Sequence, residues 1–174
     1  MDAPSGHSKL FGVFIGSTRE DLWRERDLLR RRLLSGPFIP VAAEAFNAGP
    51  ESKWAVIERN LRTCDYCVII VGKRYGTIDP TDPEGRSYTE REYDFARSRM
   101  PVMVFLSREV NDDLIDAQAS HRERLQVFRQ RLRSEQILCE WETASELVDA
   151  VRSSLYEAMK NFPRPGWIRG DMLM

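Results

Sequence analysis

Strand-like and helix-like segments alternate along this chain, and that alternation narrows the possible folds to one class. Short apolar runs, typical of buried strands, are each followed by a segment whose apolar residues recur at helical spacing. The expected strands are residues 10–15, 38–43, 66–72, 101–106 and 137–141, and the helices that follow them are 20–34, 53–64, the segment SYTEREYDFA, 121–133 and 144–162. Strands joined through helices pair in parallel with right-handed crossovers. We therefore predict an α/β fold with a doubly wound, five-stranded parallel sheet in the order 2-1-3-4-5.

The size and composition fit one globular domain. The chain has 174 residues, of which 42% are hydrophobic and 30% are charged. A domain of this size buries a core without disulfides or metals. We expect residues 1–8 to be a disordered tail, 9–162 to be the α/β domain, and 163–174 to be a C-terminal tail or linker. Such a linker suggests that further domains are fused after it.

Charge and hydropathy disfavour several partners. The formal net charge of −1 argues against direct nucleic-acid binding, which normally needs a basic excess. The apolar run CVIIVG is too short to cross a membrane, and the first residues lack the apolar core of a signal peptide. Three cysteines suit a reducing compartment. The cytoplasm is the expected location.

Cys64 and Cys67 form a C-x-x-C pattern, which raises the question of redox or metal chemistry. A redox pair is expected at a helix N-terminus, where the helix dipole lowers the thiol pKa. This pair instead lies where a helix ends and a strand begins. The sequence has no second cysteine pair and only two histidines, His7 and His121. We interpret Cys67 as a small apolar strand residue.

The predicted sheet reverses its strand order between the first and third strands, where ligands bind in such folds. The loop IGSTRED follows the first strand. Gly16 permits close backbone approach, and Ser17 and Thr18 place hydroxyls at a helix N-terminus, which favours an anion. Alternatively, Ser17 and Glu20 form a capping box, and both interpretations can hold. The sequence lacks the Walker spacing and G-x-G-x-x-G, which disfavours a triphosphate hydrolase or a Rossmann dehydrogenase.

Two glutamates lie near the start of the helix that follows the third strand. Ser87 and Glu90 have the spacing of a capping box. Glu90 is thereby explained as a helix-start residue, and its loss is expected to cost at most about 1 kcal/mol.

Glu92 lies about 200° around the helix from Glu90. It shares a helix face with Tyr88, four residues before it, and with Ala96, four residues after it. Glu92 can therefore project over the end of the third strand, where it could act as a catalytic carboxylate. The alternative is a solvated surface carboxylate paired with Arg99.

Four segments together resemble a Toll/interleukin-1-receptor-like (TIR-like) domain: VFIGSTRED, DYCVIIVGKRYG, SYTEREYDFA and MPVMVFL. The resemblance covers residues 9–106. It is strongest to an uncharacterised prokaryotic subfamily found at the N-terminus of multidomain NTPase and repeat proteins in defence systems. It implies a flavodoxin-like fold and a signalling role. It also implies cleavage of the nicotinamide–ribose bond of NAD⁺ as a substrate, without a cofactor.

The resemblance also implies a set of site residues. The family's catalytic glutamate follows an aromatic residue by four positions and precedes a small residue by four, which matches Glu92 and not Glu90. The other implied residues are the substrate contacts Gly16, Ser17 and Thr18 and the pocket wall of Tyr75, Gly76 and Tyr88. The loop around Phe46 and Asn47 is implied to contact a second subunit, in keeping with self-association.

Two other functions stay open at this point. Many TIR-like domains are non-catalytic interaction modules, and the charged helix HRERLQVFRQRLR offers a contact face. A nucleotide- or nucleoside-derivative binding domain, possibly one that transfers a base, is the other. Nucleoside deoxyribosyltransferases have E-x-G-x-A at this helix, whereas this chain has Glu92-Tyr93-Asp94-Phe95-Ala96. The missing glycine argues against base exchange.

Overall fold

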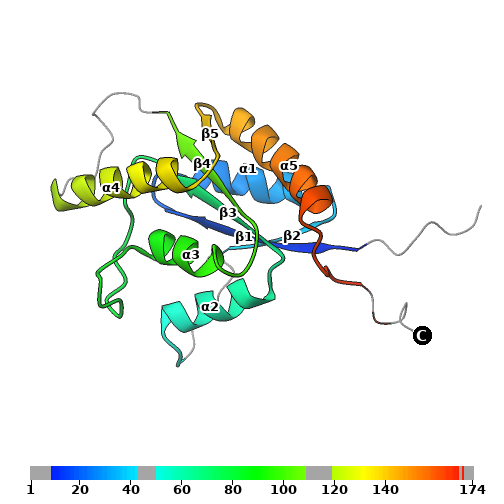
Figure 1. Cartoon of the computed structure of the whole chain (residues 1–174), viewed down its shortest axis with the longest axis horizontal. Helices are drawn as coiled ribbons and strands as arrows, with labels where there is room; N and C mark the ends of the chain where they lie inside the picture. Colours follow the sequence, from blue (N-terminus) through cyan, green and yellow to red (C-terminus); the bar gives the residue numbers. More distant parts are fainter. Residues whose placement is uncertain (1–8, 43–49, 109–118, 169, 171–174) are drawn as a thin grey trace, which may run out of the picture.

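Five parallel strands form one sheet in the order β2-β1-β3-β4-β5 in the computed structural model, which describes residues 9–42, 50–108, 119–168 and 170 (Figure 1). The elements are β1 (Phe11–Ser17), α1 (Trp23–Leu33), β2 (Phe38–Val41), α2 (Lys53–Thr63), β3 (Tyr66–Val71), α3 (Tyr88–Ala96), β4 (Val102–Ser107), α4 (Ala119–Glu135), β5 (Leu138–Trp141) and α5 (Ala144–Asn161). The predicted fold class and strand order are confirmed. The expected tail at 1–8 and the residues Phe46 and Asn47 lie outside the described residues.

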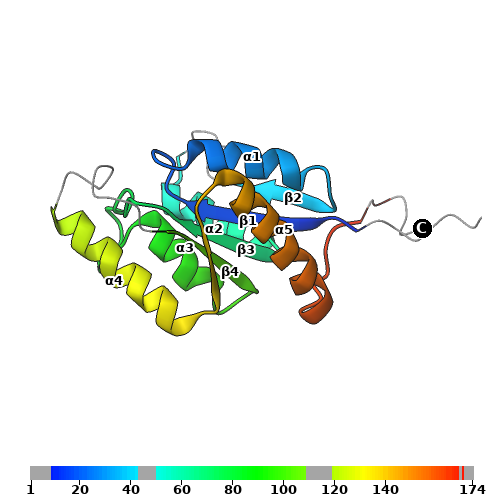
Figure 2. The same ribbon diagram turned by 90° about the horizontal axis from the view of Figure 1, so that it is seen from above.

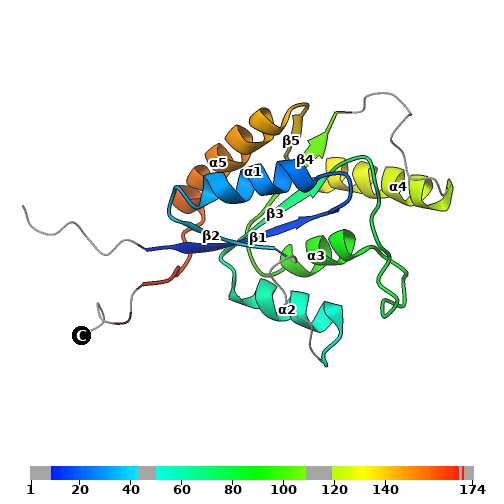
Figure 3. The ribbon, with the colours of Figure 1, turned by 180° about the vertical axis from the view of Figure 1, so that it is seen from behind.

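Helices cover both faces of the sheet. α1 and α5 lie on one face, and α2, α3 and α4 lie on the other (Figures 1 and 3). α1 and α5 run side by side across their face (Figure 2). Because strand side chains alternate between faces, Val68 and Ile70 of β3 pack toward α1 and α5, whereas Cys67 and Ile69 pack toward α2, α3 and α4. Every residue of β3 is buried, which explains its unbroken apolar run.

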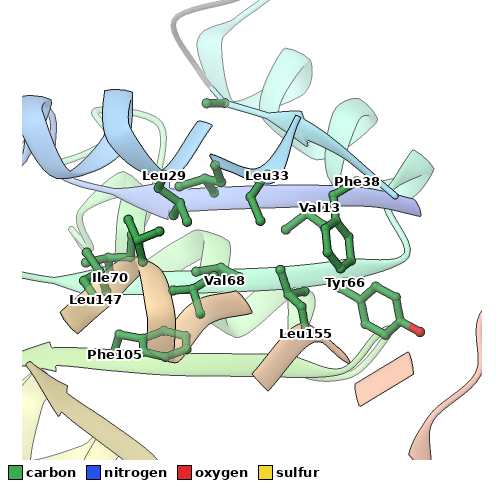
Figure 4. Close-up of a cluster of buried hydrophobic side chains, with 14 of the residues drawn as sticks. Val13, Leu29, Leu33, Phe38, Tyr66, Val68, Ile70, Phe105, Leu147 and Leu155 are labelled. Carbon is green, nitrogen blue, oxygen red and sulfur yellow. The ribbon is translucent and has the colours of Figure 1, made fainter. Parts of the chain in front are cut away.

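The core under α1 and α5 is a layer of aliphatic and aromatic side chains (Figure 4). Val13 and Val68 of the sheet meet Leu33 of α1 and Leu155 of α5 in this layer. Tyr66 closes one end, and its hydroxyl donates a hydrogen bond of 3.0 Å to the carbonyl of Phe162. Burial of this layer anchors the helices, since apolar area removed from water is the main stabilising contribution.

The segment after α5 contacts the beginning of the sheet, although we expected a tail or linker with little structure there. Leu10 and Trp167 form an antiparallel bridge. The carboxylate of Asp65 accepts a hydrogen bond of 3.1 Å from the amide of Gly166, which has a φ of 65°. Asp65 is buried, and its second oxygen accepts a hydrogen bond of 2.9 Å from the amide of Gly12 in β1. The same carboxylate therefore joins the start of β1 to the segment after α5, which orders that segment.

β1 and β3 end together at one edge of the sheet. Their register pairs Gly16 with Ile69 and Ser17 with Ile70. α3 follows the loop after β3 and runs back along the sheet, so its first turns lie at this carboxyl edge, toward the left in Figure 1. The fold thereby places the end of β1, the loop after β3 and the start of α3 in one region. Among the helices in the described ranges, none combines the length and apolar character that a membrane span requires.

Candidate active site

Glu92 lies on the sheet-facing side of α3. Its side chain is buried, with 4% of the residue exposed. A Cβ placed on Gly16 would stand 2.7 Å from Glu92 Oε2, so the carboxylate lies directly over the end of β1. The alternative of a solvated carboxylate paired with Arg99 is wrong. Arg99 instead donates a 3.0 Å hydrogen bond to the carbonyl of Phe95, and its guanidinium group lies over the phenyl ring of the same residue.

The start of α3 is held by a more extensive network than the predicted capping box. The hydroxyl of Ser87, the N-cap, accepts from the amide of Glu90 at 3.3 Å, as predicted. The amide of Ser87 donates to the hydroxyl of Tyr75 at 3.2 Å, where a capping box would use the Glu90 side chain. The buried Glu90 carboxylate instead accepts from Tyr75 at 2.5 Å and pairs with Arg131 at 3.0 Å. Its loss should therefore cost more than the value expected from a simple cap.

The predicted capping box of Ser17 and Glu20 is wrong. Ser17 is the last residue of β1, and α1 begins six residues later, with Leu22 as its N-cap. The hydroxyl of Ser17 donates to the carbonyl of Thr18 at 3.0 Å. Nη1 of the buried Arg26 donates to the hydroxyl of Ser17 and, at 3.3 Å, to its carbonyl. A buried guanidinium is thus placed at the end of β1.

Several contacts join the loops after β1 and β3, among them an ion pair of Glu20 with Arg74. Asp21 accepts from the hydroxyl of Thr18 and, at 3.0 Å, from the amide of Lys73. Gly76 has a φ of 87°, and a Cβ there would stand 2.7 Å from the methyl carbon of Thr18. A side chain at position 76 would therefore separate the loops. The structure brings Gly16, Thr18, Gly76 and Glu92 to the same edge of the sheet.

The two predicted aromatic residues of the pocket wall differ in exposure. Tyr75 is 2% exposed and packs in the core under α3 and α4. Burial, and then its hydrogen bond to Glu90, raises the pKa of the Tyr75 hydroxyl. Its described contacts support α3. Tyr88 is half-buried, and the amino group of Lys53 lies 4.0 Å from its ring centre.

Comparison with known sequences decides the family. The family described as "Domain of unknown function (DUF4062)" matches residues 12–156. The chain belongs to this family. No curated protein matches the sequence at a significant level.

The DUF4062 domain of this chain has a TIR-like fold. It superposes on the TIR domains of the activated Roq1 resistosome, which recognises the pathogen effector XopQ, with a TM-score of 0.53 and 9% identity over 83% of this chain and 99% of that chain. The RPS4 and RRS1 TIR domain heterodimer gives a TM-score of 0.47 and 14% identity over 83% and 95%. Translation elongation factor SelB from Methanococcus maripaludis, in complex with the GTP analogue GppNHp, gives 0.52 and 12% over 92% of this chain and 35% of that chain. At 9% identity, the similarity to the Roq1 TIR domains establishes the fold alone.

Ion pairs order the loop between β3 and α3, and sequence reasoning missed them. The carboxylate of Asp82 accepts three hydrogen bonds from Arg86, from its amide at 2.8 Å, Nε at 3.0 Å and Nη2 at 2.9 Å. Asp79 accepts from the amide of Thr81 at 2.9 Å and from Arg91. The alternating acids and arginines of this segment were the available signal. The sequence does not show which acid pairs with which arginine, because an irregular loop has no helical or strand periodicity from which its path can be predicted.

The pair of Asp82 and Arg86 makes a pH-dependent contribution to stability. Hydrogen bonds from Arg86 outweigh burial and lower the pKa of Asp82 from 3.8 to about 2. A lowered folded-state pKa stabilises the domain above the unfolded-state pKa, and the contribution is lost as pH falls from about 4 toward 2. We expect Asp82→Asn to lower the free energy of unfolding at pH 7 by about 2 kcal/mol and to flatten its dependence on acid pH. Urea denaturation at pH values from 7 to 2.5 measures both.

Glu84→Gln is the control for Asp82→Asn. Glu84 is exposed and reaches Arg86 only at 3.6 Å. Its substitution should leave the acid dependence as in the wild type. Equal effects of the two substitutions would contradict the assignment of the pH dependence to Asp82.

The arginines of α4 are used inside the domain. Arg124 donates to the carbonyl of Gly85 at 2.5 Å. The buried Arg129 donates to the carbonyls of Gly72 at 3.0 Å and Ser107 at 2.5 Å, which follow or end β3 and β4. This charged helix therefore holds the carboxyl edge of the sheet, which weakens the interpretation that its charges form a contact face for partners.

Cys64 and Cys67 are buried in the DUF4062 domain, and Cys139 is partly buried. Burial, and then the charge of Asp65, raises the pKa of the Cys64 thiol to about 12. Burial also raises the pKa of Cys67 well above its ordinary value, with Glu92 contributing next. Both thiols therefore stay protonated at neutral pH, which is the opposite of a reactive redox pair. Within the described ranges, no three His, Cys, Asp or Glu side chains gather as a metal ion would need.

Proposed function

We propose that the DUF4062 domain of this chain cleaves the bond between nicotinamide and ribose in NAD⁺, with Glu92 as its catalytic carboxylate. The observation that carries the proposal is the position of this one acid. Glu92 is buried on α3 and lies over Gly16, at the point where the sheet reverses its strand order. The resemblance of the surrounding segments to TIR-like domains supplies the reaction class.

One carboxylate is enough for this reaction. Glycosidases that act on sugar–oxygen bonds use a second carboxyl to protonate the leaving group. Nicotinamide carries a positive charge in NAD⁺. When the C1′–N bond breaks, its electron pair stays on the nicotinamide nitrogen, and nicotinamide leaves as a neutral base. Water then adds to C1′ and loses a proton, which gives ADP-ribose, nicotinamide and one proton. Attack by an adenine ring nitrogen in place of water gives a cyclic product, and the positive charge then lies on the adenine ring.

Glu92 would act on the ribose. Positive charge develops on the sugar as the bond breaks, and a fixed negative charge in a site that excludes water stabilises it. The same carboxylate can accept hydrogen bonds from the ribose hydroxyls and so orient the ring. The burial of Glu92 provides the low-dielectric surroundings in which this electrostatic effect is large.

The remaining residues would bind the substrate. We assign the loop residues Gly16, Ser17, Thr18 and Gly76 to contacts with the nucleotide. Gly16 lies against Glu92, and Thr18 and Gly76 lie beside each other in the adjoining loops, which supports the assignment. Tyr88 is the better candidate for stacking on a base, since Tyr75 is almost fully buried. We further propose that activity requires self-association, in keeping with a role in defence or signalling.

Incubation with NAD⁺ tests the proposal. We expect the concentrated chain, or copies clustered on a multivalent scaffold, to release nicotinamide in proportion to time and enzyme, as measured by liquid chromatography. The dilute chain should release it more slowly if association completes the site. Added free base distinguishes hydrolysis from base exchange, because exchange forms a new nucleoside. Clustered protein that is folded and releases no nicotinamide would contradict the proposal and favour an interaction module.

A further inference from the structure

α3 and α4 are joined by a ladder of charged side chains. We call it the α3–α4 ladder and define it by Glu90, Asp94 and Arg97 on the α3 side and Arg131 and Glu135 on the α4 side. Arg131 pairs with Glu90 at 3.0 Å and with Asp94 at 2.8 Å. Glu135 pairs with Arg97 at 2.7 Å and accepts from the hydroxyl of Tyr93 at 2.9 Å. Charges alternate along the ladder, so each group meets the opposite sign.

The ladder follows one side of α3. Positions 90, 94 and 97 are spaced by four and three residues, so they form one stripe along the helix. Glu92 lies about 200° from Glu90 and faces the sheet. Arg131 therefore holds the side of α3 that is opposite to the candidate catalytic carboxylate.

The ladder also reaches the loop before α3. Glu90 takes Arg131 on one carboxylate oxygen and the hydroxyl of Tyr75 on the other. That hydroxyl in turn accepts from the amide of Ser87, the N-cap. One chain of contacts thus runs from α4 to the N-cap of α3, and it fixes both the start and the rotation of the helix.

Small rotations of α3 matter for catalysis. A glutamate carboxylate stands about 6 Å from its helix axis, so a rotation of about 10° moves it by about 1 Å. A misplacement of about 1 Å can cost a factor of about 10² in rate. We propose that Arg131 is a positioning residue for Glu92, through which α4 sets the rotation of α3. This inference rests on the proposed function.

Arg131→Met tests the inference in the full chain. Methionine keeps much of the length of the side chain and removes the charge, so Glu90 and Asp94 lose their shared partner. We expect kcat for nicotinamide release to fall about tenfold to a hundredfold while KM stays within about twofold. Arg131→Lys keeps a charge near Glu90 but lacks the planar fork that reaches two carboxylates, so it should recover only part of the rate. If Arg131→Met does not fold, Arg131→Lys is the variant that tests the inference.

Arg133→Met is the matched control. Arg133 is on the same helix and is exposed, and it pairs with Glu140 of β5 at 3.2 Å, away from α3. We expect its kcat and KM to match the wild type. A loss of rate equal to that of Arg131→Met would overturn the inference, since it would point to a general effect of charge on α4.

A readout independent of activity separates this inference from the proposed function. Selective labelling with ¹⁵N-glycine gives one backbone signal for each of the 10 glycines. Gly16 lies against the Glu92 carboxylate, so its signal reports the position of that group. We expect the Gly16 signal to move in Arg131→Met and to stay in place in Arg133→Met. A lower Tm with an unmoved Gly16 signal would overturn the positioning role, whether or not the wild type cleaves NAD⁺.

Discussion

Glu92→Gln should abolish nicotinamide release by the clustered domain, with a loss of about 10³-fold in kcat. Glutamine matches glutamate in size and keeps one acceptor oxygen, but it carries no charge to stabilise the ribose cation. Steady-state release of nicotinamide with and without the substitution measures the loss. Binding of NAD⁺ should change little, because the interaction that is lost forms only as the bond breaks.

The free energy of unfolding of Glu92→Gln should not fall, although its activity is lost. A carboxylate held out of water carries a desolvation penalty that a neutral amide largely avoids. Glu92 is buried, so Glu92→Gln should leave the free energy of unfolding unchanged or raise it. A catalytic group is expected to show this pattern, whereas a structural carboxylate would lose stability on substitution. Urea denaturation of both proteins at neutral pH measures the difference.

Glu90→Gln is the comparison for this prediction. Glu90 is two residues away, on the same helix, and its carboxylate is committed to Tyr75 and Arg131. Its substitution should lower the free energy of unfolding by about 2 kcal/mol, because hydrogen bonds to charged groups are lost. The rate should fall by no more than about tenfold, through the position of α3. If Glu90→Gln removed activity and Glu92→Gln kept it, the two roles would be reversed.

The sheet could be predicted because its signals are local and repeated. The unbroken apolar run of β3 and the alternating helices determine a doubly wound sheet, and its order then follows from connection rules. The 3.6-residue period of one helix placed Glu92 on a different face from Glu90, although it left open whether that face meets the sheet or the solvent. Each of these inferences uses spacing within a single element, which the sequence contains directly.

The contacts between elements could not be predicted in the same way. Glu90 has the spacing of a capping box with Ser87, yet Arg131 from α4 takes its side chain. Asp65 precedes β3 and accepts a hydrogen bond from the amide of Gly166, near the C-terminal end of the sequence. Such partners are far apart in sequence, and many arginines compete for each carboxylate. Three-dimensional packing chooses among them, so the sequence predicts that acids will be paired but not which base pairs with which acid.

Gly16→Ala should nearly abolish nicotinamide release while costing little stability. The new Cβ would stand 2.7 Å from both Glu92 Oε2 and Ile69 Cδ1. Both are the far ends of flexible side chains, so they can move aside at a cost of about 1 kcal/mol. The glycine's entropic cost in a strand is removed at the same time. The displaced carboxylate, however, no longer stands where the ribose charge develops, and we expect a rate loss of about 10²-fold.

Gly12→Ala, in the same strand, should show the reverse pattern. Its Cβ would stand 3.2 Å from the Cα of Cys64 and 3.5 Å from the carbonyl of Thr63. These are backbone atoms that cannot turn away, so the free energy of unfolding should fall by about 1–3 kcal/mol. Gly12 lies at the opposite end of β1 from Gly16, so the rate of the folded protein should stay near that of the wild type. Thermal unfolding and nicotinamide release, measured on both variants, test this contrast. Full activity in Gly16→Ala would mean that a carboxylate pushed off the end of β1 still works, and the single-acid mechanism would then be wrong.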